Sequence, residues 1–184
     1  MPGRTPTEAV DAFLEPLKES LACVARAKIT LSPGGRAIRG KTHALTVNDD
    51  KPISLRYPPG APVLMLRVCM QYEIVPNDQP GQEPWRVSTR GYDYELQAAS
   101  GEIIWSYHWH PGTRVERPHI HIGRTQLADD AVMSAKAHHP TDRVSLESII
   151  RACITEYGAD PLKDDWDKTL ALREGLFKLY RRWS

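Results

Sequence analysis

The stretch from Ile103 to Gly123, IIWSYHWHPGTRVERPHIHIG, decides how the sheet of this chain is built. Apolar and polar residues alternate at both of its ends, and successive side chains of a β-strand point to opposite faces. One face of the first segment carries Ile103, Trp105, Tyr107 and Trp109, and the other carries Ile104, Ser106, His108 and His110. Ile120 and Ile122 separate in the same manner from His119 and His121. We therefore predict two neighbouring strands with a covered apolar face and four histidines on the open face.

Pairing these two strands as an antiparallel hairpin predicts a compact histidine patch. With a closing loop from Pro111 to Pro118, the simplest register sets His110 opposite His119 and His108 opposite His121. Opposed Cβ atoms in such pairs are roughly 5 Å apart, and diagonal ones about 7 to 8 Å. Four imidazole rings can then share one small area.

The preceding hairpin is predicted to bring carboxylates to the same face. The strand WRVSTRGYDYELQA is joined to EIIWSYHWH by the short connection Ala99-Ser100-Gly101. Counting back from this turn sets Asp93 near Ser106 and Glu95 near Ile104. Carboxylates in these positions can orient imidazole rings.

The N-terminal part of the chain is predicted to form a helix followed by strands. Thr5 to Glu8 has the form of a capping box with proline at the first helical position, and apolar residues at helical spacing extend it from about Pro6 to Leu21. Pro16 is expected to kink or split this helix. Strand-like runs follow, separated by Gly- and Pro-rich turns: CVARAKITLS, KPISLRY and VLMLRVCMQYEIV. The third predicts a long central strand, because its apolar residues alternate over Leu64 to Ile74.

The C-terminal third is predicted to be helical. Ser145 is a candidate N-cap for a helix that ends near Gly158, and a second helix is expected from about Asp165 to Arg181. The order of elements predicts one α+β domain over residues 1–184. Its antiparallel sheet has about five or six strands, with the N-terminal helix and two C-terminal helices packed on one face.

Composition narrows the function classes. The chain has 184 residues, 41% of them hydrophobic, and a formal charge of +1, which argues against a strongly electrostatic nucleic-acid binder. Its three cysteines, Cys23, Cys69 and Cys153, show no C-x-x-C spacing, so neither a disulfide framework nor a cysteine metal site is indicated. The N-terminal segment carries acids where a signal peptide needs an apolar run, and no stretch approaches the roughly 18 apolar residues of a membrane span. We predict a cytoplasmic protein without a membrane partner.

One hypothesis for the patch is a metal centre. His108, His110, His119 and His121 offer three or four neutral imidazoles, enough to bind Zn, Fe or Cu, with an open position if three bind. The segment HWHPG also resembles the start of the cupin motif. Glu116, six residues after His110, departs from the spacing of that motif.

A second hypothesis is acid–base chemistry on RNA without a cofactor. In a crowded set of histidines, one ring can accept a proton from a 2′-hydroxyl while a charged ring protonates the leaving oxygen. This chemistry needs groups that hold the phosphate, and guanidinium groups bind phosphate bidentately. The candidate phosphate-binding residues are Arg90, Arg114, Arg117 and Arg124.

The run from the histidine strand through Pro-His-x-His-x-Gly to HHPTDRVSLESIIR resembles a poorly characterised bacterial family. Its order is similar to that of TumE-type toxins of bacterial toxin–antitoxin pairs, over about Tyr92 to Ala152. His119 and His121 correspond to the His-x-His element of those toxins, and the N-terminal half of the chain departs from them. The resemblance implies an RNA-targeting toxin with a cognate antitoxin as partner. Of the three functional hypotheses, we therefore rank a toxin-like ribonuclease first, a histidine-ligated metalloprotein second and a non-catalytic protein-binding module third.

Two further histidines lie outside the hairpin. His138 and His139 precede Pro140, which keeps His139 out of a helix. The sequence leaves two alternatives open for them. They either fold back towards the patch or belong to a loop without a role in it.

Overall fold

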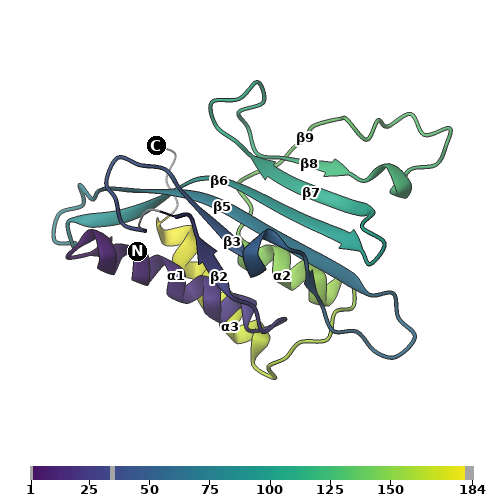
Figure 1. The fold of residues 1–184 in the computed structure, drawn as a ribbon, viewed down its shortest axis with the longest axis horizontal. Helices are drawn as coiled ribbons and strands as arrows, with labels where there is room; N and C mark the ends of the chain where they lie inside the picture. Colours follow the sequence, from purple (N-terminus) through teal and green to yellow (C-terminus); the bar gives the residue numbers. More distant parts are fainter. Residues whose placement is uncertain (1, 34–35, 181–184) are drawn as a thin grey trace.

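The computed structural model describes residues 2–33 and 36–180, and it has the predicted α+β architecture. Within these residues, nine strands form one antiparallel sheet in which the main path runs β2-β3-β5-β6-β7-β8-β9. Strand β1 pairs with β6 and strand β4 pairs with β5, outside that path. Figure 1 shows the three helices gathered on one side of this sheet.

Five strands carry most of the sheet, close to the predicted number. They are β3 (His43–Val47), β5 (Leu64–Pro76), β6 (Trp85–Ala98), β7 (Ile103–Trp109) and β8 (His119–Ile122). The others have two or three residues each: β1 (Pro2–Gly3), β2 (Ile29–Leu31), β4 (Ile53–Ser54) and β9 (His139–Pro140). Two-residue strands are too short for an alternation of apolar and polar residues to predict them.

The covered face of the sheet follows the predicted alternation. In β5, the residues Leu66, Val68, Met70, Tyr72 and Ile74 are all buried, while their neighbours are half-buried or exposed. Strand β6 adds Tyr92, Tyr94 and Leu96 to the same core. Each strand therefore has one apolar face in the core and one more polar face.

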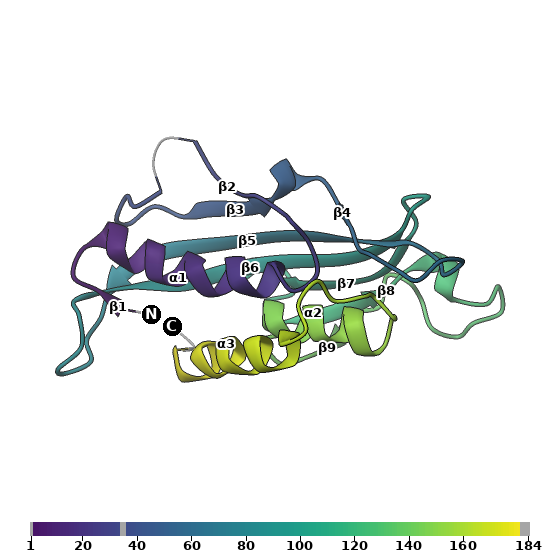
Figure 2. The ribbon, with the colours of Figure 1, turned by 90° about the horizontal axis from the view of Figure 1, so that it is seen from below.

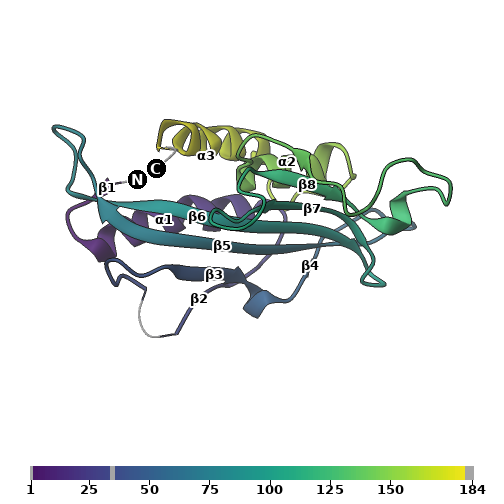
Figure 3. The same ribbon diagram turned by 90° about the horizontal axis from the view of Figure 1, so that it is seen from above.

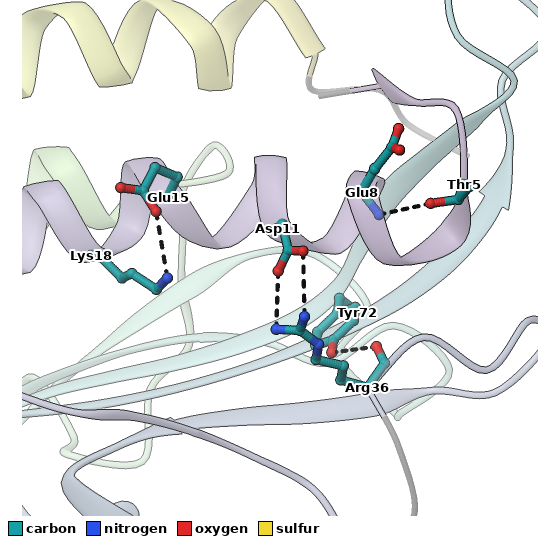
Figure 4. Close-up of polar contacts among 7 residues, drawn as sticks. All are labelled: Thr5, Glu8, Asp11, Glu15, Lys18, Arg36 and Tyr72. Atoms are coloured by element: carbon teal, nitrogen blue, oxygen red, sulfur yellow. Dashed lines mark hydrogen bonds and ion pairs between the residues drawn. The ribbon is translucent and has the colours of Figure 1, made fainter.

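Helix α1 (Pro6–Leu21) has the predicted bounds, and its N-terminus is capped as the sequence suggests. The Thr5 hydroxyl accepts a hydrogen bond from the Glu8 backbone N–H (Figure 4). The Glu8 carboxylate accepts one from the Arg4 backbone N–H. Pro16 lies inside the helix and does not split it. One turn after Pro16, the Ser20 hydroxyl donates a hydrogen bond to the Pro16 carbonyl.

A polar contact ties the segment before β3 to α1. The Tyr72 hydroxyl donates a hydrogen bond to the Arg36 carbonyl, and the Arg36 guanidinium pairs with Asp11 on α1 at 3.0 Å (Figure 4). Tyr72 is buried in the core, so this contact joins the helix, the segment and the sheet. Farther along α1, Lys18 pairs with Glu15 on its exposed surface.

The two C-terminal helices complete the cover. Helix α2 (Leu146–Thr155) begins after Ser145, whose side chain accepts a hydrogen bond from the Ser148 N–H, as predicted. Helix α3 (Trp166–Tyr180) follows, and Figure 2 shows it alongside α1. The predicted end of that helix, Arg181, lies outside the described residues. Short 3₁₀ turns occur at Asn48–Asp50 and Arg124–Gln126.

The helices meet one another and the sheet through buried contacts. The Ser20 hydroxyl of α1 lies 3.0 Å from the Glu147 carboxyl of α2, and both residues are buried. Trp105 of β7 packs against Tyr157, just beyond α2. Among residues 2–33 and 36–180, no helix has the length and apolar character needed to cross a membrane.

Candidate metal centre

The histidines of β7 and β8 stand on the sheet face away from the helices. His108 pairs with His119 across the two strands, and Ser106 pairs with His121. On the opposite face, Trp105 and Trp109 are 4% and 7% exposed. The shared parity of the two strands is therefore as predicted.

The register differs from the prediction by two residues. The expected pairs were His110 with His119 and His108 with His121, whereas His108 faces His119. The reason lies in the connecting loop, where a tight turn begins at His110. The His110 carbonyl accepts hydrogen bonds from the Thr113 N–H and hydroxyl, and Gly112 has φ +84°. Pro-Gly at the centre of a turn favours this conformation and removes His110 from the strand.

The preceding hairpin is displaced in the same sense. Asp93 faces His108 and Glu95 faces Ser106, rather than Ser106 and Ile104 as predicted. An irregularity between Leu96 and Gln97 inserts one extra residue into β7. The displacement brings the Asp93 carboxylate opposite a histidine, which the predicted register did not.

Three histidines form the centre of the site, and we call them the histidine triad: His108, His119 and His121. Each offers one ring nitrogen, and these atoms all lie within 4.8 Å of one another. Their ring centroids are 5.0 to 5.7 Å apart. His119 is 5% exposed and the other two are half-buried. His110, predicted as a fourth member, is outside the triad, with its ring 5.6 Å from that of His108.

A fourth ring reaches the triad from a distant part of the chain. His138 lies in the long connection between β8 and β9, which leaves the ends of the strands and returns to the sheet (Figure 3). Its ring centroid is 4.7 Å from that of His119 and 4.5 Å from that of His121. Of the two alternatives left open by the sequence, folding back towards the patch is the one that occurs for His138.

Two rings of the triad each have a polar contact that restricts their orientation. His119 Nδ1 lies 2.8 Å from the Arg117 carbonyl oxygen, so this nitrogen carries a proton and donates it to the carbonyl. His108 Nε2 lies 3.1 Å from Asp93 Oδ1. In the rings of His108 and His119, one nitrogen is thus engaged by the protein.

Asp93 is itself held by a chain of charges across the open face. Arg67 lies 3.7 Å from the Asp93 carboxylate and 2.9 Å from that of Asp50. Burial raises the pKa of Asp93, but the contacts with His108 and Arg67 outweigh it, and the net pKa lies below the ordinary value. The carboxylate is therefore ionised when it contacts His108.

The pKa values of two triad histidines are lowered. For His119 and His121, burial disfavours the charged ring, and the neighbouring histidines lower the pKa further. The hydrogen bonds with the backbone of Arg117 and Ala135 act in the opposite direction and are outweighed. Both rings therefore favour the neutral form near pH 7, which is the form that binds metals.

The four arginines predicted to hold a phosphate have different surroundings in the structure. Arg90 pairs with Glu73 at 2.7 Å, and Arg124 pairs with Asp129 at 3.4 Å. Arg114 and Arg117 are exposed in the loop between β7 and β8, and the Arg117 carbonyl, rather than its guanidinium, contacts the triad. Two of the four guanidinium groups, those of Arg90 and Arg124, are thus engaged by carboxylates.

Sequence reasoning missed two supporting residues and left His138 undecided. Arg67 has the right parity on β5 to share the open face with Asp93, so alternation carried a signal for it. Asp50 and His138 lie in irregular segments without a period, and no local pattern predicts where such segments return to the sheet.

Comparison with known proteins adds no relative. No protein family, no curated protein and no solved structure matched this chain. The resemblance to TumE-type toxins stays a prediction.

Proposed function

We propose that this protein is a metalloprotein in which His108, His119 and His121 bind one transition-metal ion. The observation that carries the proposal is the convergence of three imidazole nitrogens within 4.8 Å. Nitrogen ligands of tetrahedral Zn²⁺ lie about 2.0 to 2.1 Å from the ion and hence roughly 3.4 Å from one another. Closing the difference requires small rotations of side chains on strands that are already paired.

The contacts behind the rings support the same proposal. Metal-binding histidines usually donate their second ring N–H to a carboxylate or a backbone carbonyl, which sets the tautomer and the ring orientation. Asp93 stands in this position for His108, and the Arg117 carbonyl does so for His119.

The chemistry of the three ligands limits which metals are expected to bind. An all-imidazole set without thiolate suits Zn, Cu or Fe, whereas Mg and Ca prefer oxygen ligands. We propose Zn²⁺ first, with Fe and Cu as the alternatives. Three protein ligands leave a coordination position at which a bound metal can polarise water or another small ligand.

The ribonuclease hypothesis has weaker support. Acid–base cleavage of RNA needs cations that hold the phosphate, and Arg90 and Arg124 are each paired with a carboxylate. RNA as substrate, an antitoxin as partner, a non-catalytic protein-binding role and a cytoplasmic location all remain predictions from the sequence. RNA cleavage that survives chelation and is lost in the doubly substituted His119→Ala/His121→Ala variant would support that hypothesis instead.

The test is metal affinity in matched histidine variants. The protein, purified without a histidine tag and stripped of metal, is titrated with Zn²⁺ against a chromophoric chelator. We expect one equivalent to bind, and we expect His108→Ala, His119→Ala and His121→Ala each to weaken binding by at least about 100-fold. His110→Ala is the control, because it removes a neighbouring ring outside the triad, and it should change affinity by less than about 3-fold. Equal losses in all four variants, or no binding by the wild type, would contradict the proposal.

A further inference from the structure

The connection that carries His138 differs in construction from the strands that carry the triad. We call residues 124–138 the strap. It leaves β8, makes one 3₁₀ turn at Arg124–Gln126 and returns to pair with β8 through β9 (Figures 1 and 3). Its other backbone hydrogen bonds in the described structure are local turns, such as those from Ala131 N–H to the Ala128 carbonyl and from Ala137 N–H to the Ser134 carbonyl.

The strap is weakly anchored between its ends. The side chains from Asp129 to Ser134 are exposed, including the apolar Val132 and Met133. The ion pair between Arg124 and Asp129 is also exposed, and exposed pairs contribute little to stability. Segments with few buried contacts open at low free-energy cost, so the strap can move without unfolding the sheet.

The strap nevertheless touches the triad through His138. Its ring packs edge-on against those of His119 and His121. Pairing of His139 with Ile120 and of Pro140 with His119 fixes the backbone just after His138. The sheet therefore holds the backbone on the C-terminal side of His138, whereas residues 124–138 have no such pairing with a strand.

His138 differs from the triad in one respect that matters for a metal. It is exposed, and it is not part of the group whose ring nitrogens converge within 4.8 Å. Its ring is close enough to the triad for a change of side-chain rotamer to turn a nitrogen towards the same point. Zn²⁺ in proteins takes four ligands, and the triad supplies three.

We propose that His138 is a fourth, exchangeable metal ligand, carried by the strap. This inference rests on the proposed metal centre. With the strap against the triad, four imidazoles surround the ion and close the coordination sphere. When the strap lifts, the His138 nitrogen leaves and one water molecule takes its place, which opens the position to a small external ligand.

The experiment compares His138→Ala with His139→Ala in the metal-loaded protein. His139 is the matched control, because it is the next residue and also a histidine, but its pairing is with Ile120 rather than with the triad. The untagged protein is loaded with Co²⁺, whose visible absorption reports the number and type of ligands. Azide is then titrated as a small anionic probe of an open coordination position.

For His138→Ala we expect an altered Co²⁺ spectrum, Zn²⁺ affinity lowered by about 10-fold or more, and azide binding at lower concentration than in the wild type. His139→Ala should keep the wild-type spectrum and azide response. Hydrogen exchange should show the strap amides protected by Zn²⁺ in the wild type and less so in His138→Ala. A His138→Ala protein that binds one Zn²⁺ with wild-type affinity, spectrum and azide response would overturn this inference while leaving the triad as a metal centre.

Discussion

The two faces of β7 and β8 show how one pair of strands serves two purposes. On the helix side, Trp105 and Trp109 are buried and make aromatic contacts with Tyr107 and Tyr92. On the open side, the same strands present His108 and its partners, which make few apolar contacts and several polar ones. Because side chains alternate along each strand, the residues that stabilise the fold lie on one face and the candidate metal ligands lie on the other. Substitutions on the two faces should therefore have different consequences.

The largest expected effect is on the covered face. Trp105→Ala should lower the free energy of unfolding by about 3 to 5 kcal/mol, because it removes a buried aromatic side chain from the core. Urea denaturation of the metal-free protein measures the change. Ile103→Ala, in the same strand but 40% exposed and paired with Gln97 beyond the irregularity, is the control and should cost less than about 1 kcal/mol. Equal costs for the two variants would show that the faces do not differ as described.

The next effect concerns the open face and should leave the fold intact. Asp93→Asn should weaken Zn²⁺ binding by about 10- to 100-fold, because it removes the ionised carboxylate that orients His108. Glu95→Gln is the matched control, since Glu95 lies on the same face but hydrogen-bonds with Gln97 and Ser106. Chelator competition should place the control within about 3-fold of the wild type. Unchanged affinity for Asp93→Asn would show that this contact does not support a metal.

A pH dependence distinguishes the buried carboxyl group of Glu147 on α2 from the half-buried one of Glu174 on α3. Burial raises the pKa of Glu147, so the stability it contributes is present below its unfolded pKa and is lost as the pH rises through the folded pKa. Burial also raises the pKa of Glu174, but contacts with Lys178 and Ser148 outweigh it and lower the pKa overall. Its contribution is therefore present above the unfolded pKa and is lost as the pH falls.

Glutamine variants should reveal these opposite signs. Relative to the wild type, Glu147→Gln should become more stable as the pH rises from 4 to 8 (about the range in which folded and unfolded carboxyl groups titrate), and Glu174→Gln should become less stable. Urea denaturation at several pH values, with EDTA present, gives the two slopes. Slopes of the same sign would contradict the assignment of Glu147 as a carboxyl group whose pKa is raised by burial.

The smallest effect is expected at the exposed edge of the open face. Arg124→Ala breaks an ion pair with Asp129, whose side chain is fully exposed, and should change the free energy of unfolding by less than about 1 kcal/mol. Zn²⁺ affinity should be unaltered. If RNA cleavage is found and this variant abolishes it, Arg124 acts on a phosphate, as the sequence-based hypothesis predicts.

How far the sequence predicts this molecule depends on the range of the interactions concerned. The bounds of α1, the Ser145 cap and the two faces of β7 from Trp105 to Trp109 follow from local patterns, and these predictions are confirmed. The faces predicted for Ile103 and Ile104 were wrong, because the irregularity next to them leaves Ile103 40% exposed and packs Ile104 against the core. The predicted strand registers were wrong by two residues. The turn at His110 and the irregularity at Leu96 change which residues pair, and the alternation of apolar residues does not reveal either of them. An even shift preserves parity, so the face was right even though the partners were not.

The residues of the site could likewise be predicted only where they follow a local pattern. His108, His119 and His121 were predicted from spacing alone, and the structure brings their ring nitrogens together. His110, predicted as a fourth member, is outside the triad, because its backbone carbonyl accepts the hydrogen bonds of a turn. His138 enters from the strap, where no periodic pattern indicates the path of the chain.

X-ray absorption at the metal edge of the untagged, Zn²⁺-loaded protein tests the metal centre most directly. The account predicts a first coordination shell of nitrogen at about 2.0 to 2.1 Å, with the outer-shell scattering of at least three imidazole rings, and a loss of one ring's contribution in His119→Ala. A shell containing sulfur at about 2.3 Å, or an unstructured oxygen shell that His119→Ala leaves unchanged, would contradict it.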